Sequence, residues 1–348
     1  MVPETMEAVL LTGHGGLDEL AYREDVPVPE PGADDVLVAV EACGLNNTDI
    51  WTRKAAYGDD DTGWKGELDF PIIQGADIAG EIVDVGSNVS EGRIGERVLV
   101  DNALYADAPN EFQALVDADL IGSERDGGYA EYAAVPAENA HWIDSSLSAA
   151  ELATFPTAYV TAERMLNRAG VGAGDDVLVT GASGGVGTGL VQLARRRGAR
   201  VLGLTSSGKA DSVREIGADE IVARDEEELS TVLEGWTEDG RVDVVADVVG
   251  GESFQEFLES LRPGGGVVTA GAVAGPVTEI DLRTVYLKQV DVVGSTMGTR
   301  SEFRDLVRYI EDGDVEPLLA ETYPLSEIHE AQRHFTRSDY VGNIVVEP

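Results

Sequence analysis

A glycine-rich turn is the part of this 348-residue chain whose residue types and spacing point most directly to chemistry. Residues 176–187 read Asp-Val-Leu-Val-Thr-Gly-Ala-Ser-Gly-Gly-Val-Gly, so an apolar run enters the turn, and a helical pattern opens at Thr188. A strand that leads through such a turn into a helix directs backbone N–H groups and the positive helix end at one point, which suits the pyrophosphate of a dinucleotide. We therefore expect the phosphate to lie against Ala182, Ser183, Gly184, Gly185, Val186 and Gly187.

The elements that must position this turn form a βαβ series. Apolar runs predict strands at 201–205, 220–222, 242–249, 267–270 and 292–295. Helical patterns occupy 209–216 and 254–261, and we expect residues 262–266, Arg-Pro-Gly-Gly-Gly, to close the second helix. Largely apolar strands that alternate with amphipathic helices predict an α/β fold with a doubly wound parallel sheet of the Rossmann type.

The upstream half has a different pattern. Short strands at 36–40, 78–85, 97–100 and 129–135 are separated by Gly, Pro, Asn and Asp, which favours a small antiparallel β domain. Helices at 303–311 and 326–335 and a strand at 342–346 follow the βαβ series. A chain of this length is expected to form two domains, here residues 1–157 with 298–348, and residues 158–297.

The charge balance is extreme, because 65 acidic residues face 25 basic ones, for a net charge of −40. Such a chain repels itself in dilute buffer, but the screening length falls to about 3 Å in molar salt. The acids are dispersed rather than gathered in a tail for a basic partner, a pattern typical of a halophilic protein. Nucleic acid and anionic membranes are poor partners for this surface. The single cysteine, Cys43, and the absence of a signal-like or membrane-spanning apolar run predict a cytoplasmic location.

Several ordered motifs resemble the medium-chain dehydrogenase/reductase superfamily, in particular its zinc-free quinone oxidoreductase and zeta-crystallin-like branch. They are Ala-Cys-Gly-Leu-Asn at 42–46 followed by Asp49, Trp51 and Arg53, Gly-Ala-Asp-Ile-Ala-Gly-Glu at 75–81, Asp-Gly-Gly-Tyr-Ala-Glu-Tyr at 126–132, and Phe-Pro-Thr at 155–157 with Thr161. The resemblance implies a GroES-like antiparallel β domain, a Rossmann domain and an active-site cleft between them.

Zinc is where the sequence departs from the better-known alcohol dehydrogenases. Their catalytic zinc takes a cysteine and the histidine of a Gly-His-Glu motif, but this chain has Ala76 in place of that histidine. No Cys or His lies in 152–157, and the segment 101–126 lacks the four cysteines of the structural zinc. We therefore expect no metal, and we interpret Cys43 as a buried packing residue rather than a ligand or nucleophile.

Without a Lewis acid, hydride transfer suits an acceptor that delocalises its own charge, such as a quinone or an α,β-unsaturated carbonyl. The resemblance places Asn46, Trp51 and Tyr57 near the nicotinamide. Two interpretations are open for each residue. Asn46 either donates a hydrogen bond to the developing oxyanion or is a turn residue, and Trp51 either stacks on a flat substrate or fills the domain interface. Tyr57 is a proton donor or a surface tyrosine.

Cofactor choice depends on the end of the second strand, where NAD-binding folds usually carry an acid. Residues 205–209 read Thr-Ser-Ser-Gly-Lys, and hydroxyls with a lysine suit the 2′-phosphate of NADP(H). We expect Ser206 and Lys209 to contact it, and the resemblance adds Arg224. The resemblance also implies that Thr157, Thr161, Gly271, Ala272 and Thr296 flank the nicotinamide, and that paired edges at 292–295 form a homodimer.

Three other interpretations of the whole chain are possible. A short-chain dehydrogenase is disfavoured because no downstream Tyr has Lys four residues later. The chain could also be a zinc alcohol dehydrogenase with substituted ligands, and metal analysis of the purified protein would test this. A protein that binds NADPH without turnover would show tight binding but no oxidation of any quinone or enone.

The net charge predicts that the protein becomes more stable as salt is added. Because repulsion among the acids dominates at low ionic strength, the melting temperature should rise from dilute buffer to molar KCl. An osmolality-matched sucrose series separates charge screening from solute exclusion. A melting temperature that stays flat in KCl would contradict this interpretation.

Overall fold

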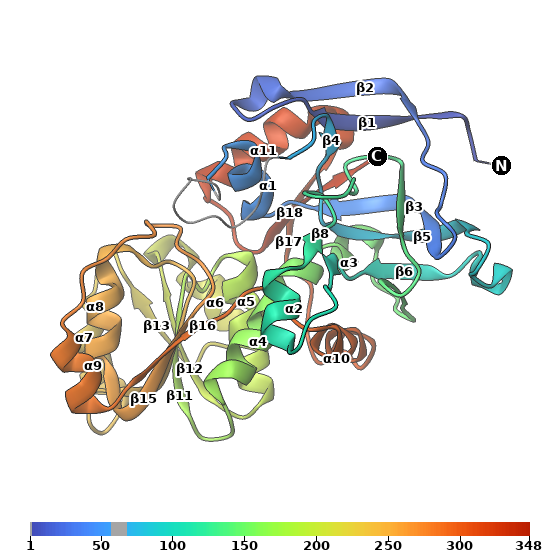
Figure 1. Ribbon diagram of the computed structural model, residues 1–348. Helices are drawn as coiled ribbons and strands as arrows, with labels where there is room; N and C mark the ends of the chain where they lie inside the picture. The colour runs from blue at the N-terminus through green and yellow to red at the C-terminus, as the bar shows by residue number, and fades with distance from the viewer. Residues whose placement is uncertain (1, 57–67) are drawn as a thin grey trace. The chain divides into compact units, whose positions relative to one another are not determined.

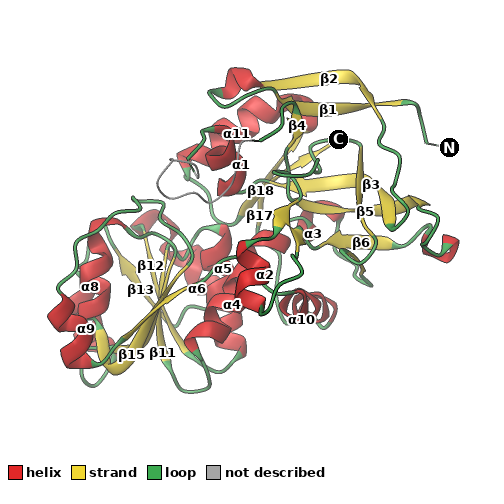
Figure 2. Ribbon diagram, in the orientation of Figure 1, coloured by secondary structure: helices red, strands yellow, loops and turns green. Residues whose placement is uncertain are grey.

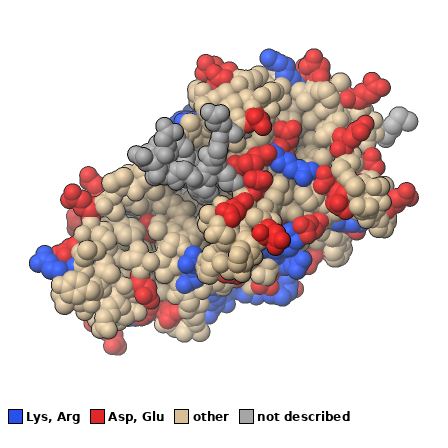
Figure 3. Space-filling model, in the orientation of Figure 1, with Lys and Arg blue, Asp and Glu red and all other residues tan. Residues whose placement is uncertain are grey.

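The computed structural model describes residues 2–56 and 68–348, and it consists of two compact units. The first unit comprises Met1–Thr157, Phe303–Asp339 and Asn343–Pro348. The second comprises Ala158–Glu302 and Tyr340–Gly342 (Figure 1). Within the described ranges, no helix is long and apolar enough to cross a membrane. Acidic side chains are scattered over the face shown in Figure 3 rather than gathered in one block.

The first unit is built on a mainly antiparallel, seven-stranded sheet in the order β10-β6-β5-β3-β18-β17, with β9 also pairing with β3. Its strands are β3 (Asp35–Gly44), β5 (Asp77–Val85), β6 (Arg97–Val100), β9 (Tyr132–Pro136), β10 (Ala140–Trp142), β17 (Leu319–Pro324) and β18 (Asn343–Glu347). Smaller sheets hold β1 (Thr5–Leu11), β2 (Leu20–Pro27) and β4 (Ile72–Ile73), and β7 (Ala103–Leu104) and β8 (Asp119–Leu120). The helices are α1 (Asn47–Arg53), α2 (Glu111–Val116), α3 (Ala149–Leu152), α10 (Arg300–Glu311) and α11 (Ile328–Arg337).

The close contact of β3 with β5 forms the centre of this unit. A Cβ atom on Gly80 would lie 2.1 Å from the carbonyl oxygen of Ala39, so only glycine allows the two backbones to approach this closely. The two strands pair from Val36–Val85 to Gly44–Asp77. This register carries Cys43 and Asp77 into the buried interior at the ends of the strands.

The second unit is a parallel six-stranded sheet in the order β13-β12-β11-β14-β15-β16. Its strands are β11 (Asp176–Thr180), β12 (Arg200–Thr205), β13 (Glu220–Ala223), β14 (Val242–Asp247), β15 (Leu261–Thr269) and β16 (Asp291–Gly294). Helices α4 (Pro156–Ala169) and α5 (Gly185–Arg196) lie on one face, and α8 (Phe254–Glu259) and α9 (Leu282–Lys288) lie on the other (Figure 2). The remaining helices are α6 (Ala210–Glu215) and α7 (Leu229–Trp236). The expected Rossmann-type sheet is confirmed.

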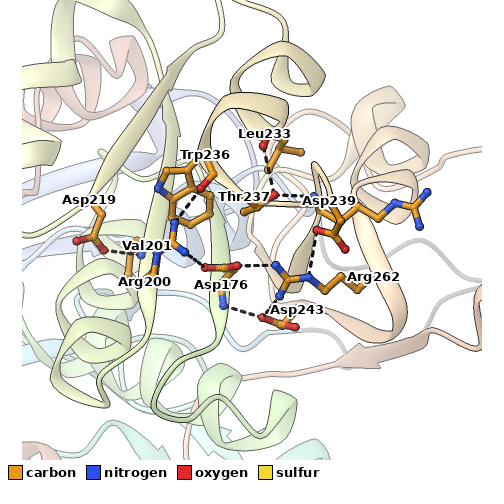
Figure 4. Close-up of polar contacts among 11 residues, drawn as sticks. Asp176, Arg200, Val201, Asp219, Leu233, Trp236, Thr237, Asp239, Asp243 and Arg262 are labelled. Atoms are coloured by element: carbon orange, nitrogen blue, oxygen red, sulfur yellow. Dashed lines mark hydrogen bonds and ion pairs between the residues drawn. The ribbon is translucent and has the colours of Figure 1, made fainter.

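The expectation that residues 262–266 only close a helix is wrong, because they lie inside β15. Leu261 pairs with Val242 and Gly266 pairs with Val244, so the intervening residues form a bulge. From this bulge Arg262 donates to Asp176 Oδ2 at 2.6 Å and to Asp243 Oδ2 at 2.5 Å (Figure 4). The guanidinium thus joins the amino-terminal ends of β11, β14 and β15 through charge-assisted hydrogen bonds.

Candidate active site

The turn between β11 and α5 has the geometry of an anion cradle. Gly184 is the N-cap of α5 in an extended conformation, and no side chain caps the first turn of that helix. A Cβ atom on Gly187 would lie 2.1 Å from the carbonyl oxygen of Gly181, so Gly187 permits the helix to begin directly against the turn. A Cβ on Gly184 would have no protein atom closer than 3.6 Å, which leaves that backbone open to a ligand. The residues present therefore fit the pyrophosphate of a dinucleotide.

A buried carboxylate that the sequence analysis overlooked holds this edge of the sheet. Asp247, at the end of β14, is fully buried and accepts hydrogen bonds from Thr180 Oγ1 at 2.7 Å and Thr269 Oγ1 at 3.3 Å. The backbone N–H groups of Val249 and Gly250 donate to it at 3.0–3.2 Å. One anion therefore fixes the carboxyl ends of β11, β14 and β15.

The structure places most of the predicted cofactor residues at this same carboxyl edge. Ser206 and Lys209 follow β12, Arg224 follows β13, and Thr296 comes shortly after β16. Gly271 and Ala272 follow β15, and a Cβ on Gly271 would lie 2.7 Å from the carbonyl oxygen of Val248. Thr161 is buried on α4, whereas Asn46, Trp51 and Thr157 belong to the first unit. Tyr57 lies outside the described residues.

An acid that the sequence analysis did not weigh also lies at this edge. Asp225 accepts a hydrogen bond from the Ser207 N–H at 2.7 Å and another from Ser207 Oγ at 2.8 Å. These two hydrogen bonds hold the pKa of the Asp225 carboxyl below its ordinary value, so it is ionised at neutral pH.

In the first unit, a second polar network surrounds Asp77. Its Oδ1 accepts from the Thr157 N–H at 3.0 Å, from Thr157 Oγ1 at 2.5 Å and from Asn102 Nδ2 at 3.2 Å. Asn102 Nδ2 also donates to Thr157 Oγ1 at 2.7 Å. Burial raises the pKa of Asp77 to about 6, although the hydrogen bonds from Thr157 favour its ionised form. The network ties Thr157 and Asn102 to the start of β5 within the first unit.

Asn46 and Asp49 form the adjoining network at the start of α1. Asp49 Oδ2 accepts from the Asn46 N–H and from Tyr129 Oη, each at 2.8 Å. Burial raises the pKa of Asp49 to about 7 and places that of Tyr129 well above its ordinary value. Asn46 is only 9% exposed, and its Nδ2 has no hydrogen-bond partner of normal geometry. The amide nevertheless lies close enough to the Asp77 carboxylate for a weak side-chain hydrogen bond that lowers the pKa of Asp77.

The donor atoms of this region do not fit a catalytic zinc. Burial raises the pKa of the Cys43 thiol well above its ordinary value, and the neighbouring acids raise it further, so the thiol is neutral as it stands in the fold. Ala76 occupies the position where the alcohol dehydrogenases carry a histidine ligand. Across residues 2–56 and 68–348, no three His, Cys, Asp or Glu side chains gather where they could hold a metal ion.

Comparisons with known proteins give consistent matches over the whole chain. Residues 32–145 match the alcohol dehydrogenase GroES-like domain, and residues 185–312 match the zinc-binding dehydrogenase family. An acryloyl-coenzyme A reductase of Sulfurisphaera tokodaii is 29% identical over 99% of this chain and 100% of its own length. A quinone oxidoreductase of Mus musculus is 31% identical over 94% of this chain and 92% of its own.

Solved structures agree with these matches. A putative alcohol dehydrogenase from Sinorhizobium meliloti 1021 is 52% identical, with a TM-score of 0.95 over 100% of this chain and 98% of that one. A 2-octenoyl-CoA carboxylase reductase in complex with NADP and 2-octenoyl-CoA is 27% identical, with a TM-score of 0.87 over 100% of this chain and 88% of that one.

The raised pKa of Asp49 predicts a specific dependence of stability on pH. Between its ordinary pKa of 3.8 and about 7 the folded protein binds a proton that the unfolded chain releases. The free energy of unfolding should therefore fall as pH rises through this window, by on the order of a few kcal/mol, and level off above it. Asp49→Asn should remove this part of the slope in urea unfolding at constant KCl.

Asp211→Asn is the matched control, because the Asp211 side chain is 98% exposed. It should leave the slope unchanged. An equal slope in the wild type and in Asp49→Asn would show that Asp49 does not take up this proton.

Proposed function

Since the chain belongs to the medium-chain dehydrogenase/reductase superfamily, we propose that it is a zinc-independent, NADPH-dependent oxidoreductase. The hydride acceptor is a quinone or an α,β-unsaturated carbonyl. The observation that carries this proposal is the buried Asn46 amide, which reaches Asp77 only with poor hydrogen-bond geometry, in a described region whose donor atoms do not fit zinc. A buried donor with so poor a hydrogen bond is costly to the fold, and a substrate oxygen would give it a better partner.

The names of the relatives support this class of acceptor. One relative is a quinone oxidoreductase, one is an acryloyl-coenzyme A reductase, and one solved structure holds 2-octenoyl-CoA. In a quinone or an enone the incoming electron pair is delocalised onto oxygen, so that one or two hydrogen bonds suffice where an isolated carbonyl needs a Lewis acid.

The carboxyl edge of the second unit supports a dinucleotide cofactor. Bound there, the nicotinamide would supply the hydride, while the turn at 181–187 binds the pyrophosphate. Ser206, Lys209 and Arg224 are the side chains we propose for the 2′-phosphate of NADPH. We propose Thr161, Gly271, Ala272 and Thr296 for the nicotinamide end.

The first unit's side chains then have separate roles. Asn46 donates its Nδ2 hydrogen bond to the oxygen that becomes negative, and Trp51 and Tyr57 remain proposals for substrate stacking and proton delivery. The Thr157 hydroxyl is committed to Asp77 and Asn102, so we propose that it positions α4 beside the nicotinamide rather than binding substrate.

A homodimer is proposed from the edge of the second unit's sheet. Strand β16 ends the described sheet, and Val277, Leu282, Tyr286, Leu287 and Val292 nearby are exposed apolar side chains. Residues 264–298 contain only three acids and two bases, in a chain whose net charge is −40. Two copies can therefore pair these edges across a two-fold axis with little repulsion. The molar mass in molar KCl distinguishes a dimer from a monomer.

The proposed activity predicts NADPH oxidation by quinones or enones in molar KCl that survives treatment with a chelator. Simple ketones and aldehydes should be poor acceptors, because they do not delocalise the negative charge. One zinc per chain with loss of activity on chelation would instead indicate an alcohol dehydrogenase with substituted ligands. Tight NADPH binding without oxidation by any acceptor would indicate a non-catalytic protein.

The role of Asn46 predicts that Asn46→Ala lowers kcat by about 10²–10³, the usual cost of losing a donor that acts in the transition state. Asn46→Asp, which keeps the shape but loses the N–H donor, should do the same. The Kd for NADPH, measured by fluorescence, should change little in either variant.

Asn47→Ala is the matched control, because Asn47 is the exposed neighbouring amide in the same helix start. Its kcat should equal that of the wild type. An unchanged kcat in Asn46→Ala would contradict the mechanism.

A further inference from the structure

The contact between Ser207 and Asp225 brings together the ends of two strands. Ser207 follows β12, Asp225 follows β13, and the two residues are 18 positions apart in sequence. The Arg224 N–H donates to the carbonyl oxygen of Thr205 at 2.9 Å, which continues the pairing of these strands. Both donors of Ser207 are bound, one to each carboxylate oxygen of Asp225, at 2.7 and 2.8 Å.

The contact between Ser207 and Asp225 lies where the adenosine ribose of a dinucleotide is expected. In dinucleotide-binding sheets of this type, the end of the second strand faces the adenosine ribose, and an acid there accepts a hydrogen bond from the 2′-hydroxyl. Residues 205–209 contain no acid, but the third strand delivers the Asp225 carboxylate to the same loop. A carboxylate at this place accepts from a ribose hydroxyl and repels a 2′-phosphate.

We propose that Asp225 is a specificity-determining residue that shifts the cofactor preference toward NAD(H), in opposition to Lys209 and Arg224. It occupies both Ser207 donors, so a 2′-phosphate gains those hydrogen bonds only by displacing an anion that already holds them. The preference for NADPH is therefore smaller than Lys209 and Arg224 alone would give. This inference rests on the proposed function only in placing a dinucleotide at this edge.

Asp225→Asn tests the inference by removing the charge while keeping the size of the side chain. The dissociation constants of NADPH, NADH, 2′,5′-ADP and 5′-AMP are measured by titration at one fixed KCl concentration. Without the Asp225 charge, Ser207 is free to bind the 2′-phosphate. The dissociation constants of NADPH and 2′,5′-ADP should therefore fall about tenfold, the size of one charge-assisted contact, and NADH and 5′-AMP should bind equally well or more weakly. Asp225→Ser should change the ratio of the two cofactor constants in the same direction.

Glu226→Gln is the matched control, because it removes the same charge one residue away, where no hydrogen bond to Ser207 exists. It should change the ratio less than twofold. The ratio within one variant is insensitive to the fraction of folded protein. A ratio in Asp225→Asn equal to that of the wild type or of Glu226→Gln would overturn this role for Asp225, whereas failure of the wild type to bind either dinucleotide would overturn the proposed function itself.

Discussion

The carboxyl edge of the second unit depends on one buried carboxyl group. Asp247 lies at the end of β14 and accepts the hydroxyl hydrogen bonds of Thr180 and Thr269, at the ends of the two neighbouring strands. A buried carboxylate is tolerated only when such donors surround it, so the three strand ends are held to it together. The turn after Thr180 and the loop after Thr269 start from these fixed points. The geometry of the proposed cofactor site therefore follows from a residue that need not touch the cofactor.

The first unit uses buried carboxylates differently. Asp49 and Asp77 have raised pKa values because they are buried, and hydrogen bonds from Tyr129, Thr157 and Asn102 favour their ionised forms. These bonds hold the first turn of α1 and Thr157 in place within the first unit. Asn46 stands between the two networks, and its amide reaches Asp77 only with poor hydrogen-bond geometry. The two networks thus form a polar framework around Asn46, the residue we propose as the donor to the substrate oxygen.

The sequence predicted the strands that are marked by a continuous apolar run. The apolar run 97–100 is β6 to the residue, and the runs at 201–205 and 220–222 correspond to β12 and β13 within one residue. The error at 262–266 has a tertiary cause, because a Pro-Gly-rich segment indicates a turn unless Arg262 binds Asp176 and Asp243. The roles of Asp247 and Asp225 were also beyond the sequence, since each depends on hydrogen-bond partners from other strands. The roles proposed for Asn46, Lys209 and Arg224 stay predictions, because no ligand contact tests them.

The net charge of −40 bears on cofactor choice less than its size suggests. NADPH is itself a polyanion, and in dilute buffer the whole surface would repel it. In molar salt the screening length falls to about 3 Å, so the field of distant acids is nearly lost. Groups that touch the ribose at hydrogen-bond distance are not screened in this way, because no ion fits between them. The Asp225 carboxylate, which accepts from Ser207 at 2.7–2.8 Å, is the group we propose for this position. Wherever salt screens a strongly acidic surface, selection between two anionic cofactors therefore becomes a property of a few contacting side chains, and a single carboxylate can outweigh the dozens around it.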